Sequence, residues 1–366
     1  PSDVPGEGEV VEYLIEYGMF LAKAGTIVIA VMLVIGAIAA AGSRRRGAGK
    51  RGRIKVTELN GHVKELRDAL RGSVLNKAQL KKLTKAEKAQ RKQENKERKQ
   101  QEKAAAADPE QESAKEKRTF VLRFKGDMAA GKVASLREEI TAILSIAGES
   151  DEVLLCLESP GGMVHAYGLA SSQLVRIKDR NIPLTICVDK VAASGGYMMA
   201  CLADKLVAAP FAIIGSVGVL VQMPNFYRAL QRKEIDYEIV TAGEFKRTLT
   251  TFGEITQKAR DKVQEDVDTI HDLFKNWVKD HRPAVDLAKI ATGETWVGIQ
   301  ARDLQLIDEI STSDECIVTA CEEHKVYEVE YVIRKSAHER LGKALYAALD
   351  RLLLKWFNTP VNSNLQ

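Results

Sequence analysis

The chain has 366 residues, 45% of them hydrophobic, and a formal net charge of +4. This length exceeds what one compact domain usually needs, and the apolar content can fill a sizeable core. The small net charge excludes a nucleic-acid function argued from charge alone. The five cysteines are odd in number and lack a CxxC pair, which argues against a disulfide framework and a structural zinc site.

The first element along the chain is an uncharged segment at residues 24–43. About 20 residues of helix extend about 30 Å, which matches the hydrocarbon core of a bilayer. We therefore predict a single transmembrane helix within an N-terminal segment of residues 1–43. A buried core helix and a cleaved signal peptide are the alternatives, although the acidic residues between Asp3 and Glu12 are unlike the basic start of a signal peptide.

Residues 44–118 are predicted to form a basic juxtamembrane region followed by a charged spacer. Arg44, Arg45 and Arg46 follow the span directly, and such clusters normally stay on the cytoplasmic side of a membrane. Residues 76–117 consist mainly of Lys, Glu, Gln and Ala and cannot fill a core, so they are either disordered or a solvated helix. The segment lacks interleaved aromatic residues, so no nucleic-acid partner is expected.

A globular domain is expected at residues 119–330, where strand and helix patterns alternate. Strands are predicted at residues 119–124, 152–158, 184–188, 205–209 and 235–243, and helices at residues 132–146, 166–178, 194–202 and 256–280. The continuous apolar runs are typical of a parallel sheet that is covered on both faces, which predicts an α/β fold. Residues 331–366 add a strand and an amphipathic helix at 337–357, expected to pack on the domain or on a partner subunit.

A glycine turn follows the predicted strand at residues 152–158 directly. It reads Ser159-Pro160-Gly161-Gly162. Consecutive glycines let the backbone approach a ligand closely and leave N–H groups available to an anion, which is what an oxyanion hole requires. An ordinary turn can have the same sequence, so the motif by itself leaves both interpretations open.

Ser194 stands among alanines and glycines, between a predicted strand and a predicted helix. Small neighbours expose its hydroxyl, and a helix N-terminus favours a developing negative charge, as in a nucleophile elbow. Serine is also a good helix N-cap, so a purely structural role is the alternative.

A serine nucleophile needs a base, and the sequence offers two candidates. His165 is the histidine nearest to these motifs, and Lys246 follows a predicted buried strand and the aromatic Phe245. A lysine can accept a proton when an apolar enclosure disfavours its charged form. Most lysines are solvated surface charges, so position alone does not select Lys246.

Five segments together resemble the signal peptide peptidase A family of serine peptidases. They are LLCLESPGG, VDKVAASGGYMMAC, PFAIIGSVGV, GEFKRTLTTFGE and TGETWVGIQARDLQLIDEI, in the family's order between about residues 119 and 310. The span, the charged spacer and the single catalytic domain resemble the SohB-type branch of the family most closely. The resemblance implies a Clp protease/crotonase-like fold for residues 119–330 and a single-pass location in a bacterial inner membrane.

The resemblance also implies which residues act. The SGGY match assigns the nucleophile to Ser194, and the GxFK match assigns the general base to Lys246. Gly161 and Gly162 correspond to the oxyanion donors, and Ser216 corresponds to a serine that orients the lysine. No metal or organic cofactor is implied. The expected partners are membrane-derived peptides or unfolded protein segments as substrates, the lipid bilayer, and further copies of the chain in a homo-oligomeric ring.

Departures from the family pattern are few. Val217 replaces isoleucine, and Gln305 stands where glycine is usual. Met198 and Met199 replace commoner polar or aromatic residues, which leaves the shape of the substrate pocket open.

Three other functions compete with this interpretation. They are a Clp-type peptidase that uses His165, a crotonase-type acyl-CoA enzyme that does not need Ser194, and a non-catalytic membrane scaffold. The side of the membrane is a separate question. The charges beside the span predict a cytoplasmic catalytic domain, whereas relatives that process signal peptides often place it outside the cytoplasm, so a periplasmic domain is the alternative.

Overall fold

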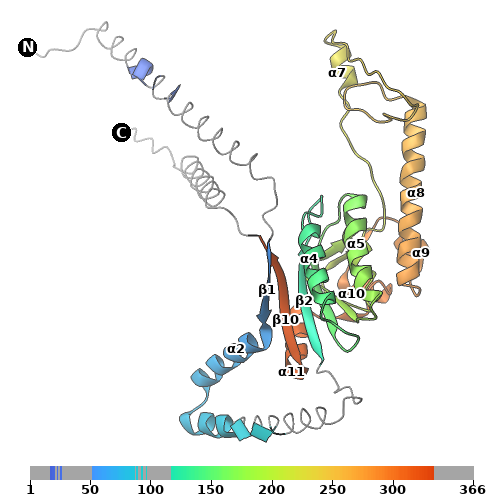
Figure 1. Cartoon of the computed structure of the whole chain (residues 1–366). Helices are drawn as coiled ribbons and strands as arrows, with labels where there is room; N and C mark the ends of the chain where they lie inside the picture. Colours follow the sequence, from blue (N-terminus) through green and yellow to red (C-terminus); the bar gives the residue numbers. More distant parts are fainter. Residues whose placement is uncertain are drawn as a thin grey trace, which may run out of the picture. The chain divides into compact units, whose positions relative to one another are not determined.

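The computed structural model describes residues 17–20, 23, 25–26, 52–86, 88–89, 92–93, 96 and 117–333 of the chain (Figure 1). Apart from residues 25 and 26, the predicted membrane span lies outside the described residues, and so does the predicted helix at 337–357. Within the described part, no helix has both the length and the apolar composition needed to span a bilayer. The chain divides into two units, and the unit of residues 54–331 contains every candidate site residue.

This unit is a mixed α/β structure built on a seven-stranded sheet with the order β1-β10-β2-β3-β4-β6-β9. The pairs that run from β10 to β9 are parallel. The strands of this sheet are β1 (Arg53–Glu58), β2 (Arg118–Lys125), β3 (Glu152–Glu158), β4 (Leu184–Val188), β6 (Lys205–Ala208), β9 (Glu309–Ile310) and β10 (Lys325–Val332).

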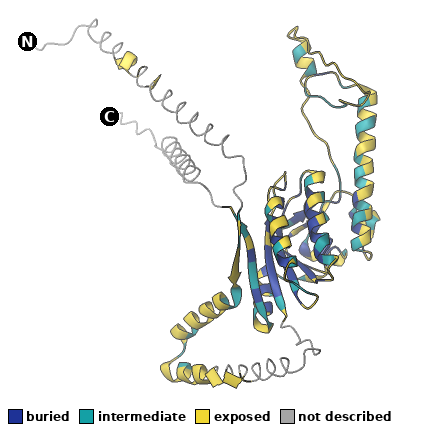
Figure 2. Cartoon of the chain, in the orientation of Figure 1, coloured by how far each residue is buried: buried dark blue, intermediate teal, exposed yellow. Residues whose placement is uncertain are grey.

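Helices cover both faces of the sheet. α4 (Val133–Leu144), α5 (Val164–Lys178) and α6 (Gly195–Ala200) pack in one hydrophobic cluster with Leu122 and Leu155, whereas α11 (Ser313–Glu323) packs in another with Val121 and Leu154. Successive strand residues point to opposite faces, so both sets are buried, as Figure 2 shows for the centre of the sheet. This double burial explains why the strands are continuous apolar runs.

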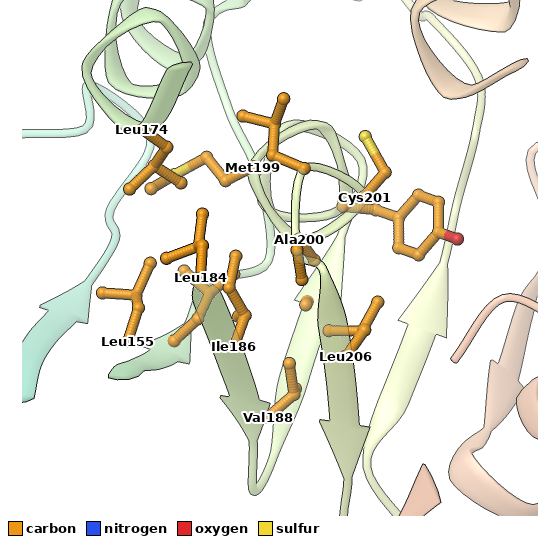
Figure 3. Close-up of a cluster of buried hydrophobic side chains, with 14 of the residues drawn as sticks. Leu155, Leu174, Leu184, Ile186, Val188, Met199, Ala200, Cys201 and Leu206 are labelled. Carbon is orange, nitrogen blue, oxygen red and sulfur yellow. The ribbon is translucent and has the colours of Figure 1, made fainter. Parts of the chain in front are cut away.

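The core beneath α6 holds that short helix firmly against the sheet. Met199 and Ala200 lie among Leu155, Leu184 and Leu206, and all five are fully buried (Figure 3). Close packing of this kind permits little movement. The residue at the N-terminus of α6, Ser194, is therefore well fixed in position.

A second, smaller sheet contains β5 (Val191–Ala193), β7 (Ile213–Gly215) and β8 (Thr295–Val297). β5 pairs with β7 in parallel, and β7 pairs with β8 antiparallel. α10 (Gly298–Asp303) follows β8. Each strand has three residues, too few for a periodic pattern, so the sequence did not predict this sheet.

An arm of residues 219–256 leaves the domain after β7 and includes the short helix α7 (Tyr227–Gln231). The chain returns along α8 (Gln257–His281) and continues through α9 (Leu287–Ile290), as Figure 1 shows. The arm has its own aromatic cluster, in which Phe252 stacks on Phe226 and contacts Tyr237.

The sequence predictions of the other strands and of the four helices of the globular domain are confirmed, but the strand predicted at residues 235–243 is wrong. These residues lie in the arm without strand structure, and the side chain of Val240 is 98% exposed. Their β-branched and aromatic content resembles that of a strand, but among the described residues no strand lies at the arm for them to pair with.

Residues 53–75 of the predicted spacer contribute to the folded unit. β1 joins the main sheet beside β10, and α2 (Leu59–Val74) follows it. The Asn60 side-chain amide donates to the carbonyl oxygens of Cys321 at 2.9 Å and of His324 at 2.8 Å. These bonds attach the first turn of α2 to the end of α11.

Candidate active site

Ser194 occupies a sharp turn between β5 and α6. Its backbone angles are φ 52° and ψ −120°, which a residue with a side chain adopts only under strain. An N-cap residue normally has extended backbone angles and a side chain that accepts a hydrogen bond from the helix, and Ser194 has neither. The geometry therefore favours a nucleophile elbow over the N-cap alternative.

Gly161 lies directly against Ser194. Two hydrogen bonds hold the glycine turn on β5: Ser159 N–H donates to Val191 O at 2.8 Å, and Ala193 N–H donates to Ser159 O at 3.0 Å. Gly161 has a φ of 89°, and a Cβ atom on it would lie 2.8 Å from Ser194 Cβ and 2.7 Å from Gly195 N. Only glycine fits here, because both the backbone angle and the space exclude a side chain.

Three backbone N–H groups lie near the Ser194 turn, and they differ in availability. The Gly161 N–H already donates to Ser159 Oγ at 3.1 Å. Within the described part of the chain, the N–H groups of Gly162 and Gly195 take part in no hydrogen bond. Gly195 is the first residue of α6, where an N–H group has no partner inside the helix. The sequence analysis missed Gly195, although its position directly after the nucleophile candidate is a usable signal.

A buried hydrogen-bonded chain braces the glycine turn. Tyr167 Oη lies 2.5 Å from Ser159 Oγ and donates to Asp127 O at 2.8 Å. The phenol has one proton, so Ser159 must donate to Tyr167, and the Ser159 oxygen is then free to accept from Gly161 N–H. Burial raises the pKa of Tyr167, which keeps the phenol protonated as this arrangement requires. The sequence analysis did not find this network.

Ser216 lies next to the Ser194 turn. Ala193 and Gly215 are partners in the parallel pairing of β5 with β7, so the two serines follow paired residues, and Ser194 N–H donates to Gly215 O at 2.8 Å. Ser216 also has a positive φ, of 53°, and its N–H donates to Glu294 O at 2.6 Å. The structure thus brings together Ser194, Ser216 and Gly161.

Lys246 is not part of this group in the single chain. Its side chain is exposed in the arm, and it lines a cavity of 760 Å³ with Tyr237, Val240 and Phe252, none of which belongs to the Ser194 turn. No hydrogen bond joins Lys246 to Ser194 or Ser216 within the described residues.

Contacts along α8 show how far the Lys246 segment lies from the serines. Phe245 packs under the ammonium groups of Lys258 and Lys262 near the beginning of α8. His271, further along the same helix, lies 3.2 Å from the carbonyl oxygen of Val217, the residue after Ser216. Nine residues separate Lys262 from His271, which corresponds to about 14 Å along the helix axis. A single chain therefore leaves the lysine remote from the serine.

His165, Met198 and Met199 are the other residues that the sequence singled out. His165 is exposed in the first turn of α5 and forms no hydrogen bond within the described residues. Met199 is buried in the core, whereas Met198 is half-buried and its carbonyl accepts a hydrogen bond from Trp277 Nε1 at 3.0 Å. Met199 therefore fills the core and does not line a surface pocket.

The parallel α/β fold with a strained serine turn is compatible with a Clp/crotonase-like peptidase domain. Comparisons with known proteins identify the family. The model "Peptidase family S49 N-terminal" matches residues 12–174, and "Peptidase family S49" matches residues 176–327. The chain is 48% identical over 332 residues to "Probable protease SohB" of Haemophilus influenzae, with 91% of this chain and 93% of that protein covered.

Two proteins named "Probable protease SohB" from Buchnera aphidicola are also similar. One, from the Acyrthosiphon pisum subspecies, is 49% identical over 241 residues, covering 66% of this chain and 72% of the relative. The other, from the Schizaphis graminum subspecies, is 41% identical over 346 residues, covering 94% and 98%. The chain belongs to peptidase family S49. The resemblance to the SohB-type branch that the motifs indicated is confirmed.

Proposed function

We propose that this peptidase is a serine endopeptidase in which Ser194 is the nucleophile and Lys246 is the general base. The observation that carries the proposal is the Ser194 turn itself. A non-glycine residue held at φ 52° costs about 1–3 kcal/mol, and such strain persists only where surrounding structure imposes it. Here Gly161, the two small-sheet strands and the core beneath α6 supply that constraint.

The proposed reaction is acyl transfer. Neutral Lys246 takes the proton of the Ser194 hydroxyl while Ser194 Oγ bonds to the carbonyl carbon of a peptide. The carbonyl oxygen becomes an oxyanion and accepts hydrogen bonds from the unengaged N–H groups of Gly162 and Gly195. Lys246 then gives its proton to the leaving amine as the C–N bond breaks. Water, deprotonated by the same lysine, hydrolyses the Ser194 ester.

The lysine in this proposal comes from a neighbouring copy of the chain. Phe245, the neighbour of Lys246, packs at Lys258 and Lys262, and Lys262 lies about 14 Å along α8 from His271, which contacts Val217 beside Ser216. Lys246 is therefore too far from Ser194 of its own chain to accept its proton, yet its segment is held in place by the Glu244–Lys258 ion pair and by the Phe245 contacts. The arm also exposes large apolar side chains, among them Leu220 (74%) and Val240 (98%). Such a surface is typical of a protein interface. A homo-oligomer would enclose Lys246 and supply the apolar surroundings that a neutral lysine needs.

Residues 24–43 are proposed to anchor the peptidase in a bacterial inner membrane, with the catalytic domain in the cytoplasm and the periplasm as the alternative. This anchor would bring membrane-derived peptides and unfolded segments near the bilayer to Ser194. Fusing a cytoplasm-active or a periplasm-active reporter after Gln366 tests the orientation, since the two reporters give opposite signals for the two orientations.

Two inactive variants test the shared site directly. Ser194→Ala and Lys246→Ala should each abolish peptide cleavage while circular dichroism shows a folded domain. Co-expression of the two in equal amounts should restore about a quarter of the wild-type activity, because half of the subunits retain each residue. Substantial cleavage by either single variant would refute the dyad. No recovery in verified mixed oligomers would show that serine and lysine act within one chain.

His165→Ala is the matched control. It should retain most of the activity, because the side chain is exposed and unconnected to the Ser194 turn. A loss as large as that of Ser194→Ala would instead favour a serine–histidine peptidase.

A further inference from the structure

α2 presents an apolar stripe that the rest of the folded unit covers only in part. Leu59 packs on the α11 side of the sheet, and Arg67 pairs with Glu322 of α11 at 3.1 Å. Beyond this contact Leu66, Leu70 and Val74 are 61%, 67% and 71% exposed. Their spacing of four residues places them on one face of the helix. We call these three residues the α2 stripe.

The α2 stripe is held in place by the folded unit. The Asn60 side chain bonds to the carbonyl oxygens of Cys321 and His324, and its oxygen accepts from Val326 N–H at 2.9 Å. Three hydrogen bonds from one side chain fix the helix to α11 and β10. The α2 stripe therefore stays exposed while the first turn of its helix is docked, as the yellow residues of α2 in Figure 2 show.

A basic helix continues from the α2 stripe. Residues 77–86 are helical, and a reciprocal cap begins the helix: Gln79 N–H donates to Asn76 Oδ1 at 2.9 Å, and Asn76 N–H donates to Gln79 Oε1 at 3.2 Å. Residues 59–86 contain seven basic and two acidic residues, and both acids precede residue 69. The bases of the second helix form no ion pair within the described part of the chain; they are Lys77, Lys81, Lys82 and Lys85.

We infer that residues 59–86 bind the surface of an anionic membrane, with the α2 stripe inserted at the level of the lipid headgroups and the lysines of residues 77–86 on the phosphates. Helices that bind such surfaces combine an apolar face with nearby lysines, and here the α2 stripe supplies the apolar face while the helix that follows it supplies the lysines. Each lysine near an anionic leaflet adds to the attraction.

The positive charge of residues 77–86 favours an anionic membrane over a second copy of the chain as the partner of the α2 stripe. Two copies paired through this segment would bring together the lysines of residues 77–86 from both chains, and no acidic residue within 77–86 compensates for them. An anionic lipid surface attracts these lysines instead of repelling them. The inference goes beyond the proposed peptidase chemistry. It uses the proposed anchor only to keep α2 near the membrane, because the 15 residues between residues 43 and 59 can extend up to about 50 Å.

Hydrogen exchange on the full chain, presented with lipid nanodiscs, tests the inference. The discs contain phosphatidylcholine alone or an equal mixture with phosphatidylglycerol. Amides of residues 59–86 should exchange at least tenfold more slowly with the anionic discs. The protection should fall in Leu66→Gln/Leu70→Gln/Val74→Gln, in Lys81→Gln/Lys82→Gln/Lys85→Gln, and in 0.5 M salt, which screens the charges. Leu273→Gln, an exposed leucine of α8, is the matched control and should leave the protection unchanged.

Three results would overturn the inference. One is equal protection with both lipids, and another is failure of the chain to associate with anionic discs. The third is protection that depends on the number of chains in a disc and not on its lipid, which would assign the α2 stripe to a second copy. Peptide cleavage measured in the same samples keeps this test separate from the proposed function, since an active enzyme without lipid protection fails the membrane inference alone.

Discussion

The Ser194 turn and the arm that carries Lys246 are built in opposite ways. The turn lies against a buried core, Ala193 N–H and Ser194 N–H donate to the carbonyl oxygens of Ser159 and Gly215, and the Tyr167 network braces the glycine turn beside it. The arm has large exposed apolar side chains. Lys246 N–H donates to Gly243 O, and the neighbouring Phe245 packs under the ammonium group of Lys258. The backbone of Ser194 is therefore held by contacts across the folded domain, whereas the segment of Lys246 is held only by contacts with nearby residues of the arm and the start of α8.

This difference indicates how activity would be controlled. A preorganised nucleophile costs nothing to position at the moment of reaction. In the proposed mechanism Lys246 needs a neighbouring surface to cover it, because burial disfavours the charged form of a lysine. In that mechanism assembly would complete the site, whereas the proposed nucleophile and the proposed oxyanion donors are already positioned within each chain.

Two glycines give the sharpest comparison of the regions. Gly161 in the turn has φ 89° and Gly243 in the arm has φ 93°, but only Gly161 is crowded. Gly161→Ala should slow labelling of Ser194 by a fluorophosphonate at least 100-fold, because the methyl group displaces the turn by about 1 Å or more. Gly243→Ala should cost less than tenfold, since open space surrounds its Cβ position. Equal losses in both variants would mean that backbone angle, and not crowding, limits the turn.

A substitution at Val240 tests the arm and leaves the Ser194 turn intact. Val240→Asp places a charge on the most exposed apolar side chain of the arm and should lower both the oligomer size in analytical ultracentrifugation and the cleavage rate, by about tenfold or more. The melting temperature of the domain should be unchanged because no core contact is lost. Ile146→Asp, at an exposed position after α4, is the matched control. Unchanged assembly and rate in Val240→Asp would contradict an interface at the arm.

Tyr167→Phe tests the brace behind the turn. Losing the Tyr167 hydroxyl removes its hydrogen bonds to Ser159 Oγ and to Asp127 O, which should cost about 1–3 kcal/mol of stability. Labelling of Ser194 should slow by less than in Gly161→Ala, since Gly161 still donates to Ser159. Denaturant unfolding measures the first effect and fluorophosphonate kinetics the second. A variant as stable as the wild type would show that the chain of hydrogen bonds is not needed.

The ion pair at the C-terminal end of α8 is expected to make the smallest contribution. Arg282 donates to both carboxylate oxygens of Asp308, at 2.9 and 2.7 Å. Burial alone would raise the pKa of Asp308, but Arg282 and the Leu206 N–H outweigh it and hold the pKa below its usual 3.8. The stabilisation is therefore present above pH 3.8 and is lost as the pH falls through the lowered value.

Asp308→Asn should accordingly destabilise the domain at pH 7 by about 1 kcal/mol, a modest value because the carboxylate is 40% exposed. The difference from the wild type should shrink at about pH 3. Melting curves at the two pH values measure it. A difference that stays constant with pH would attribute the effect to packing and not to charge.

Local patterns were sufficient where burial is continuous. The strands at residues 119–124, 152–158 and 184–188 are apolar because helices cover both faces of the sheet, so periodicity and length identified them. The same reasoning failed at residues 235–243, whose apolar side chains are exposed in the arm. The sequence did not predict β1 and α2 in the charged region, because β1 is a mostly exposed edge strand and no residue of α2 is buried.

By itself the sequence determined the family, the α/β class, and the positions of Ser194 and the glycine turn, because each motif is a short stretch whose chemistry depends on adjacent residues. Tertiary structure alone decided which N–H groups are unengaged, since Gly161 is occupied by Ser159 and Gly195 is not. It also decided that Lys246 lies apart from Ser194 in one chain. A distance between residues 52 positions apart depends on the path of the chain between them, and no local pattern encodes that path.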